Sequence, residues 1–144
     1  MKYVNYLKVA GRLAEMGFKV PLHYGSTEMM TVTTRWVQTT FADYMRTYLK
    51  SRNLDQYIDV AWNCKNFSFI AFVEAKVCNR FSEGPDAAAD IDFGVIWIPG
   101  HSVNWAVCSD EPETWQIKFF EPQRDFEEIT LTPEQIGGAH MIIV

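Results

Sequence analysis

Cys64 is the residue of this chain that is best placed for chemistry, because a polar approach precedes it and a long apolar stretch follows it. Between Phe67 and Val77 nearly every position is apolar, which predicts a helix enclosed by other elements. Cys64 then falls within the first turn of that helix, where free backbone N–H groups and the helix dipole favour a negative charge. A thiolate is such a charge, and it is the nucleophilic form of cysteine.

The other two cysteines are predicted to be ordinary core residues. Cys78 lies on the same apolar helix and Cys108 within an apolar strand, and a free cysteine packs as a small apolar side chain. Three cysteines at wide spacing form neither a zinc motif nor a disulfide framework. The sequence therefore predicts no metal ion and no other cofactor.

The best-placed base for a Cys64 thiolate is His101, which begins a predicted strand directly after the turn Pro99-Gly100. Thiol catalysis needs a base within hydrogen-bonding reach, an acceptor that orients the base, and donors that face the oxyanion. A helix whose amino terminus packs against the edge of a sheet would bring Cys64 and His101 together. His23 and His140 have no comparable partner and are predicted to be structural.

The predicted acceptor for His101 is Glu121, a carboxylate that closes an apolar strand immediately before Pro122. When two consecutive strands pair antiparallel, the start of one lies opposite the end of the other. Glu121 and His101 are therefore expected to be cross-strand neighbours. Considered alone, Cys64 could be a core residue, His101 a turn residue and Glu121 a partner of Arg124, and it is their combination that favours a catalytic site.

The order of the remaining elements, helices first and strands afterwards, is that of an α+β domain. Apolar residues recur at three and four positions in the helical segments and alternate in the strands. Helices are predicted over 5–16, 35–51 and 63–80, strands over 93–98, 101–108, 115–121 and 140–144, a linker over 82–90, and mainly loop over 18–34. We expect a single domain, 1–144, in which a buried central helix packs on an antiparallel sheet.

Composition excludes several classes of function. The net charge of −5 and scattered basic residues disfavour nucleic-acid binding, which needs a basic face. No apolar run approaches the roughly 20 residues needed to cross a bilayer, so no membrane association is expected. Charges interrupt the amino terminus, MKYVNYLKVAGRLAEMGFKV, which argues against a secretory signal and predicts a cytoplasmic protein. The oligomeric state is left open.

Three short blocks resemble the Cys, His and acidic blocks of papain-like cysteine peptidases. They are Trp62-Asn-Cys64-Lys-Asn-Phe67, Gly100-His101-Ser-Val-Asn104 and Phe120-Glu121-Pro-Gln123. They are more similar to the compact version in the carboxy-terminal domain of a fungal agglutinin, and similar blocks occur in small phage-associated proteins. The resemblance spans residues 35–123. It implies a papain-like fold in which Cys64 is the nucleophile, His101 the general base and acid, and Glu121 the residue that orients His101.

The chain departs from the family pattern on both sides of the cysteine. Papain-like enzymes place a Gln a few residues before the Cys, whereas this chain has Ile58 there and Gln56 two residues earlier. The oxyanion donors would then be the Cys64 backbone N–H together with Asn63 or Gln56. The phage-type blocks carry two acids after the Cys, where this chain has Lys65-Asn66, so metal dependence is not expected.

Four further residues are predicted to shape the site. Asn104 and Gln123 belong to the resembling blocks and are expected to hydrogen-bond the loops around it. Trp62 and Trp105 lie near it in sequence and could form the walls of a substrate groove.

Two classes of function follow from these patterns. The first is a thiol-dependent hydrolase or acyl transferase acting on an amide bond of a protein or peptide through a Cys64-His101-Glu121 triad. The alternative is a catalytically inactive papain-like binding module, such as a phage-encoded inhibitor of a protein in the host cytoplasm. A structural or assembly subunit is a third reading. The sequence names neither the substrate nor the partner.

Overall fold

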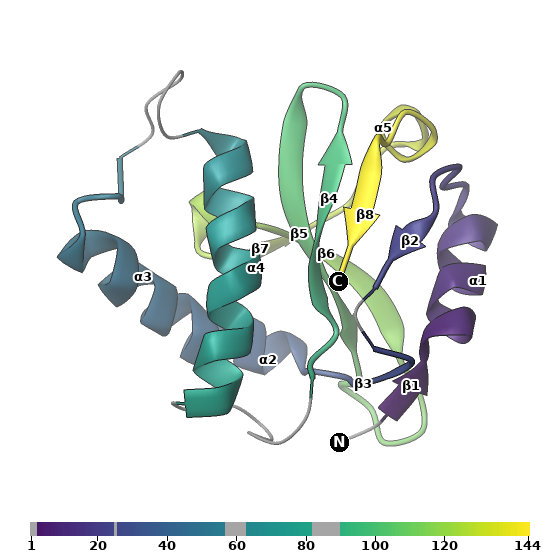
Figure 1. The fold of residues 1–144 in the computed structure, drawn as a ribbon, viewed down its shortest axis with the longest axis horizontal. Coiled ribbons are helices and arrows are strands. Elements are labelled where there is room, and N and C mark those ends of the chain that lie inside the picture. The colour runs from purple at the N-terminus through teal and green to yellow at the C-terminus, as the bar shows by residue number, and fades with distance from the viewer. Residues whose placement is uncertain (1–2, 25, 57–62, 82–89) are drawn as a thin grey trace.

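The computed structural model describes residues 3–24, 26–56, 63–81 and 90–144 (Figure 1). The helical elements are α1 (Tyr6–Met16), α2 (Thr34–Trp36), the π-helical turn η1 (Val37–Phe41), α3 (Ala42–Ser51), α4 (Cys64–Phe81), the 3-10 turn η2 (Pro122–Arg124) and α5 (Pro133–Gly137). The strands are β1 (Tyr3–Asn5), β2 (Leu22–His23), β3 (Glu28–Met30), β4 (Phe93–Ile98), β5 (His101–Cys108), β6 (Gln116–Glu121), β7 (Glu127–Ile129) and β8 (Met141–Ile143).

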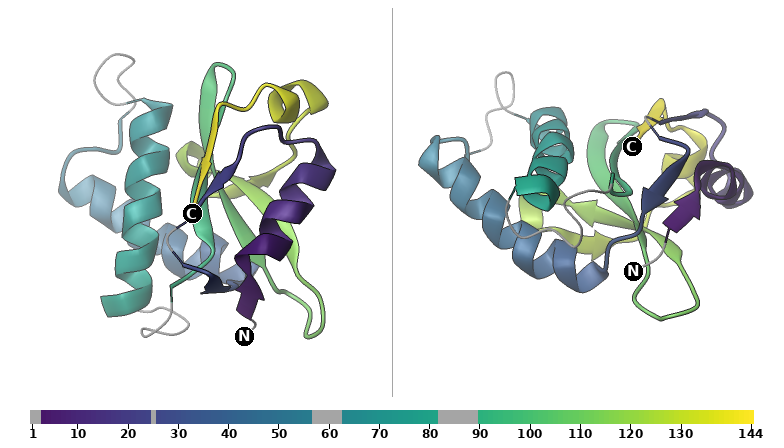
Figure 2. Two further views of the ribbon diagram at one scale, coloured as in Figure 1. Left: turned by 45° about the vertical axis from the view of Figure 1, so that its right-hand side comes forward. Right: turned by 60° about the horizontal axis from the view of Figure 1, so that its bottom comes forward.

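A six-stranded sheet forms the centre of the molecule, with strand order β2-β8-β4-β5-β6-β7. Every neighbouring pair is antiparallel except β2 and β8, which are parallel. β1 and β3 form a separate antiparallel pair. Helices α3 and α4 lie on one side of the sheet and α1 lies on the other, as the views in Figures 1 and 2 agree. The expected α+β class, with a helix packed on a mostly antiparallel sheet, is confirmed.

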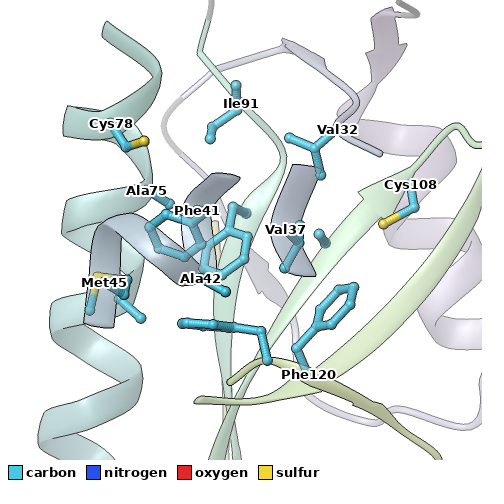
Figure 3. Close-up of a cluster of buried hydrophobic side chains, with 14 of the residues drawn as sticks. Val32, Val37, Phe41, Ala42, Met45, Ala75, Cys78, Ile91, Cys108 and Phe120 are labelled. Carbon is cyan, nitrogen blue, oxygen red and sulfur yellow. The ribbon is translucent and has the colours of Figure 1, made fainter. Parts of the chain in front are cut away.

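The central strand β5 is covered on both faces, which explains why seven of its eight residues are buried. Ala106 and Cys108 face a core shared with α3 and α4, while Val103, Trp105 and Val107 face the core under α1. Alternation along a strand therefore serves two hydrophobic cores at once. Figure 3 shows the first core, in which side chains of α4 and of the η1–α3 segment approach Phe120 of the sheet.

Helix α4 packs through a stripe at helical spacing: Phe67, Ala71, Ala75 and Cys78 are all buried. The small side chains at Ala71 and Ala75 let the helix approach the sheet closely. The opposite side is more exposed than its apolar composition predicts, since Val73 is 49% exposed. Among the described residues, the sheet and α3 cover one side of α4 and leave the opposite side exposed.

Most predicted elements agree with the structure, and the differences involve short or distant pairings. The meander β4-β5-β6 and the three long helices lie where the sequence predicts them, although β6 begins at Gln116 rather than at position 115. Residues 18–34, predicted to be mainly loop, contain β2 and β3. The predicted linker over 82–90 lies outside the described residues except for Asp90. No helix in the described ranges has the length and apolar character to cross a membrane.

Candidate active site

Cys64 is the first residue of α4, and two asparagines define that start. The Oδ1 atom of Asn63 accepts a hydrogen bond from the Lys65 backbone N–H at 3.2 Å, and the Asn66 Oδ1 atom accepts from the Asn63 N–H at 3.1 Å. The two bonds are reciprocal, as in a capping box, although the Asn63 side chain accepts from the second helical residue and not from the third. The first helical backbone bond runs from the Phe67 N–H to the Asn63 carbonyl at 3.0 Å. The partly exposed Cys64 thiol is therefore held at a fixed helix start.

His101 begins β5 and Glu121 ends β6, and their side chains meet. The His101 Nε2 atom lies 2.6 Å from the Glu121 Oε2 atom. The strand register ends with the pair Asn104 and Phe120, so the contact lies just beyond the paired residues and is diagonal. The Glu121 side chain is 6% exposed and that of His101 is 31% exposed. The imidazole is thus oriented by a nearly buried carboxylate.

The Cys64 side chain is also close to the His101 ring and contributes to raising the pKa of His101. Because Nε2 is engaged by Glu121, Nδ1 is the ring nitrogen that remains for the thiol. The hydrogen bond that the ring donates to Glu121 has the largest effect and raises the pKa of His101 to about 9, against the opposing effect of burial. At neutral pH the ring is therefore an imidazolium.

A buried polar seam fixes α4 to β5 next to these residues. The hydroxyls of Ser68 and Ser102 lie 2.5 Å apart, and both residues are fully buried. Asn104, also fully buried, donates from Nδ2 to the Ser68 carbonyl at 2.9 Å and to the Gly94 carbonyl at 3.0 Å. Ser68 lies one turn after Cys64, and Ser102 follows His101. The seam therefore sets how the helix start faces the strand.

The structure distributes the other predicted site residues over several roles. Asn104 lies too deep to contact a substrate and acts through the position of α4. Asn63 caps the helix that carries Cys64. The backbone N–H of the exposed Gln123 donates to the Glu121 Oε1 atom at 3.2 Å. This bond holds the carboxylate oxygen that does not contact His101. Gln56 is exposed, and Trp62 lies outside the described residues.

The expectation that Trp105 forms a wall of the substrate groove is wrong. Its side chain is fully buried in the core under α1, and its indole Nε1–H donates to the Ile143 carbonyl at 3.0 Å. Trp105 lies in the middle of β5, where it packs in the same core as Val103 and Val107, whereas His101 lies at the start of the strand. Trp105 therefore holds β8 against the sheet.

Sequence reasoning missed an aromatic residue beside the site. The Lys65 Nζ atom lies 4.4 Å from the centre of the Trp97 ring, within the range of a cation–π contact. Trp97 is paired with Ser102 in the β4–β5 hairpin, which places it near His101. Pairing of Trp97 with Ser102 follows from the Pro99-Gly100 turn and could have been read from the sequence.

A cavity of about 340 Å³ adjoins the site on the side of α3. Phe67 lines it one turn after Cys64, and Pro122 and Gln123 line it directly after Glu121. Met45 and Leu49 of α3 complete an apolar wall, with Arg46 among the charged residues at the cavity. No group of three or more His, Cys, Asp or Glu residues that could hold a metal ion exists among the residues the structure describes.

Comparison with known proteins reveals similarity of fold at low sequence identity. No protein-family model and no curated protein sequence matches the chain. Among solved structures, the chain is similar to a lectin of Polyporus squamosus bound to a human-type influenza-binding epitope, Neu5Acα2-6Galβ1-4GlcNAc, with a TM-score of 0.62 and 14% identity over 99% of this chain. It is also similar to the protein in a PSL1a–E64 complex, with a TM-score of 0.60 and 16% identity over 99% of this chain. The chain spans about half of each, covering 49% and 50% of their lengths.

Proposed function

We propose that this chain is a thiol-dependent hydrolase or acyl transferase that acts on an amide bond of a protein or peptide, with a papain-like fold. The observation that carries the proposal is that one imidazole, His101, contacts both the Cys64 side chain and the Glu121 carboxylate, the latter at 2.6 Å. A nucleophile, a base and a residue that orients the base are the three parts of a catalytic triad. The three residues come from three different elements, α4, β5 and β6. Packing of core residues alone gives no reason for these three side chains to meet.

In the proposed reaction the Cys64 thiolate attacks the carbonyl carbon of the amide and forms a tetrahedral intermediate. The imidazolium of His101 donates its proton to the departing nitrogen, and the carbon–nitrogen bond breaks to leave a thioester on Cys64. His101, now neutral, takes a proton from an attacking water or amine, and the thioester breaks to regenerate the thiolate. Water gives a hydrolase, and an amine gives an acyl transferase.

The oxyanion of the intermediate needs donors that are already in position. The backbone N–H of Cys64, as one of the first in α4, has no acceptor within the helix and supplies one donor. The second donor remains a prediction from the sequence, with Asn63 and Gln56 as the candidates.

Covalent labelling of the whole chain tests the proposal. The probe is E64, the compound named with PSL1a in the second structural neighbour, and a single adduct on Cys64 is expected by mass spectrometry. Cys64→Ala should abolish labelling and the turnover of a fluorogenic peptide library, whereas Cys78→Ala, at a buried cysteine, should leave both unchanged. A product with free carboxylate identifies a hydrolase, and an amide product formed with an added amine identifies a transferase.

A second candidate is a binding module that keeps this fold without catalysis. The observation that favours it is that one structural neighbour is a lectin solved with a bound glycan epitope. Since this chain spans 49% of that lectin, glycan binding is tested directly, by titration with Neu5Acα2-6Galβ1-4GlcNAc. Binding that survives Cys64→Ala, together with no turnover by the unmodified chain, would establish this function in place of the enzymatic one.

A further inference from the structure

A second cavity, of about 840 Å³, lies between α3 and α4 at the end of α4 remote from Cys64. Figure 1 shows the two helices next to each other on one side of the sheet. Residues of η1 and α3 form one wall of this cavity, and Glu74, Val77 and Cys78 of α4 form the other. None of the triad residues lines it. It is therefore a separate site.

Glu74 is the unusual residue of this cavity, because its carboxylate is only 8% exposed. Its Oε2 atom accepts a hydrogen bond from the Tyr44 hydroxyl at 2.5 Å. Within the described ranges no lysine, arginine or histidine forms an ion pair with it. A sheltered carboxylate that is hydrogen-bonded only to a neutral group is stabilised further by a cation that enters the cavity.

Aromatic rings line the approach to this carboxylate. The rings of Tyr44 and Tyr48 are stacked with centroids 6.3 Å apart. The Arg52 guanidinium, which lines the same cavity, lies 4.0 Å from the centre of the Tyr48 ring in a cation–π contact within the chain. Tyr44 stays a neutral donor, since burial and the nearby Glu74 raise its pKa well above the ordinary value.

The π-helical turn η1 adds a further feature. Such turns are rare and occur frequently at functional sites. Here the turn contributes two consecutive threonines, Thr39 and Thr40, to the lining of the cavity. The Thr39 hydroxyl donates to the Arg35 carbonyl at 2.7 Å, so the widened turn is held in place by its own side chain.

The arrangement of carboxylate oxygens around the cavity favours one kind of cation. A metal ion would need several oxygen ligands, but the other carboxylate at the cavity, Asp43, pairs with Arg46 at 2.6 Å. A guanidinium is bound best by two free carboxylate oxygens, and one oxygen of Glu74 is already engaged by Tyr44. An ammonium group is a compact charge that needs one free oxygen and an aromatic wall.

We propose that this cavity binds a primary ammonium group on an aliphatic chain, the chemistry of a lysine side chain, with Glu74 as its counter-charge and Tyr44 and Tyr48 as its walls. Glu74 follows Cys64 by ten residues on one helix, which corresponds to about 15 Å. An extended peptide would cover that distance with about five residues. The site itself does not depend on the activity of Cys64.

Calorimetric titration of the full chain tests the site with defined probes. Nα-acetyl-lysine amide should bind, and its uncharged counterpart Nα-acetyl-norleucine amide should bind at least about tenfold more weakly. A lysine-containing peptide and the free diamine cadaverine distinguish a peptide ligand from a small amine. Equal affinity for the lysine and norleucine probes, or no binding of any ammonium probe, would overturn the proposal.

Three variants locate the binding. Glu74→Gln keeps an acceptor for the Tyr44 hydroxyl and removes the charge, so it should weaken lysine binding at least about tenfold. Tyr44→Phe frees the Glu74 oxygen and should retain binding. Val77→Lys places a tethered ammonium three residues after Glu74 in the same cavity and should block the probe. Unchanged binding in Glu74→Gln would contradict the assignment, and unchanged binding in Cys64→Ala is expected because the two sites are separate.

Discussion

The Nε2 atom of His101 lies 2.6 Å from the Oε2 atom of Glu121, although 20 residues separate them in sequence. The other oxygen of Glu121 accepts the backbone N–H of Gln123 at 3.2 Å, so the carboxylate is held from both sides. The pKa of the same imidazole is also raised by the nearby Cys64 side chain at the start of α4. Three elements each supply one residue, and a shift of any one of them relative to the others would change the distances between the thiol, the imidazole and the carboxylate.

Glu121→Gln should lower the pKa of His101, because the hydrogen bond that the ring donates to Glu121 is the largest effect that raises this pKa to about 9. If acylation needs the imidazolium, kcat/KM falls as pH rises through that pKa, and the alkaline limb of the profile moves to lower pH in the variant. We also expect a loss in kcat/KM of about a hundredfold near neutral pH. Titration of the His101 ring by NMR measures the pKa without any substrate.

The matched control is Glu111→Gln, which removes the charge of an exposed glutamate outside the site. It should leave both the His101 titration and the pH profile unchanged. A His101 titration in Glu121→Gln that coincides with that of the unmodified chain would show that the 2.6 Å contact does not set the state of the ring in solution.

Native alkylation by iodoacetamide should modify Cys64 and spare the other two cysteines. Cys78 and Cys108 are 0% and 1% exposed, and burial raises the pKa of the Cys108 thiol to about 12. His101→Ala should slow the reaction of Cys64 at pH 6, because it removes the adjacent cation. Peptide mapping after a timed exposure measures both effects. A rate at pH 6 that is unchanged in His101→Ala would argue against an activating contact.

Local and nearest-neighbour patterns made much of this site predictable. Alternation and the Pro99-Gly100 turn fix the β4–β5–β6 meander, and antiparallel pairing then brings Glu121 toward His101. A change from a polar approach to an apolar run gives the start of the helix at Cys64. These features depend on residues a few positions apart or on adjacent strands, which a single sequence specifies well.

Features that depend on distant segments were not predictable. The parallel pairing of β2 with β8 joins Leu22 to Ile142 across most of the chain. Trp105 is close to His101 in sequence, but which core each face of β5 contacts depends on where α1 and α4 pack. The Ser68–Ser102 contact needs the helix and the strand to be in register, and no local pattern encodes that register.

Asp92 makes stability depend on pH. It is fully buried, and neither of its side-chain oxygens has a hydrogen-bond partner among the described residues. Burial raises its pKa to about 8, against the opposing effect of Lys76. A raised folded-state pKa gives stability that is present below the unfolded-state value of about 3.9 and is lost as pH rises to 8. The free energy of unfolding should therefore fall by up to about 1.4 kcal/mol per pH unit in this window.

Urea unfolding at several pH values between 4.5 and 6 measures this slope below the range in which His101 contributes. Asp92→Asn removes the titrating group and should flatten the slope attributed to it, whatever its effect on absolute stability. The His101 contribution has the same sign at higher pH: it is complete below about 6.5 and is lost as pH rises through about 9. A slope that persists in Asp92→Asn would assign the dependence to other groups.

The seam between α4 and β5 should couple stability to reactivity. Ser68 donates to the Lys65 carbonyl at 3.1 Å, which leaves Ser102 as the donor of the buried hydroxyl pair. Ser102→Ala removes that donor and should cost about 1 kcal/mol of stability. In a double-mutant cycle with Ser68→Ala, the coupling energy should also be about 1 kcal/mol, because the two hydroxyls are in direct contact.

The same variants should slow labelling of Cys64, since the seam fixes the helix start against the strand that carries His101. Ser51→Ala, which alters an exposed serine at the end of α3, is the control and should change neither measurement. Stability comes from chemical denaturation and reactivity from the rate of iodoacetamide modification. If the seam only stabilises the fold, Ser102→Ala lowers the free energy of unfolding while the labelling rate of the folded protein stays the same. A parallel loss in both shows that the contact also positions the thiol against the imidazole.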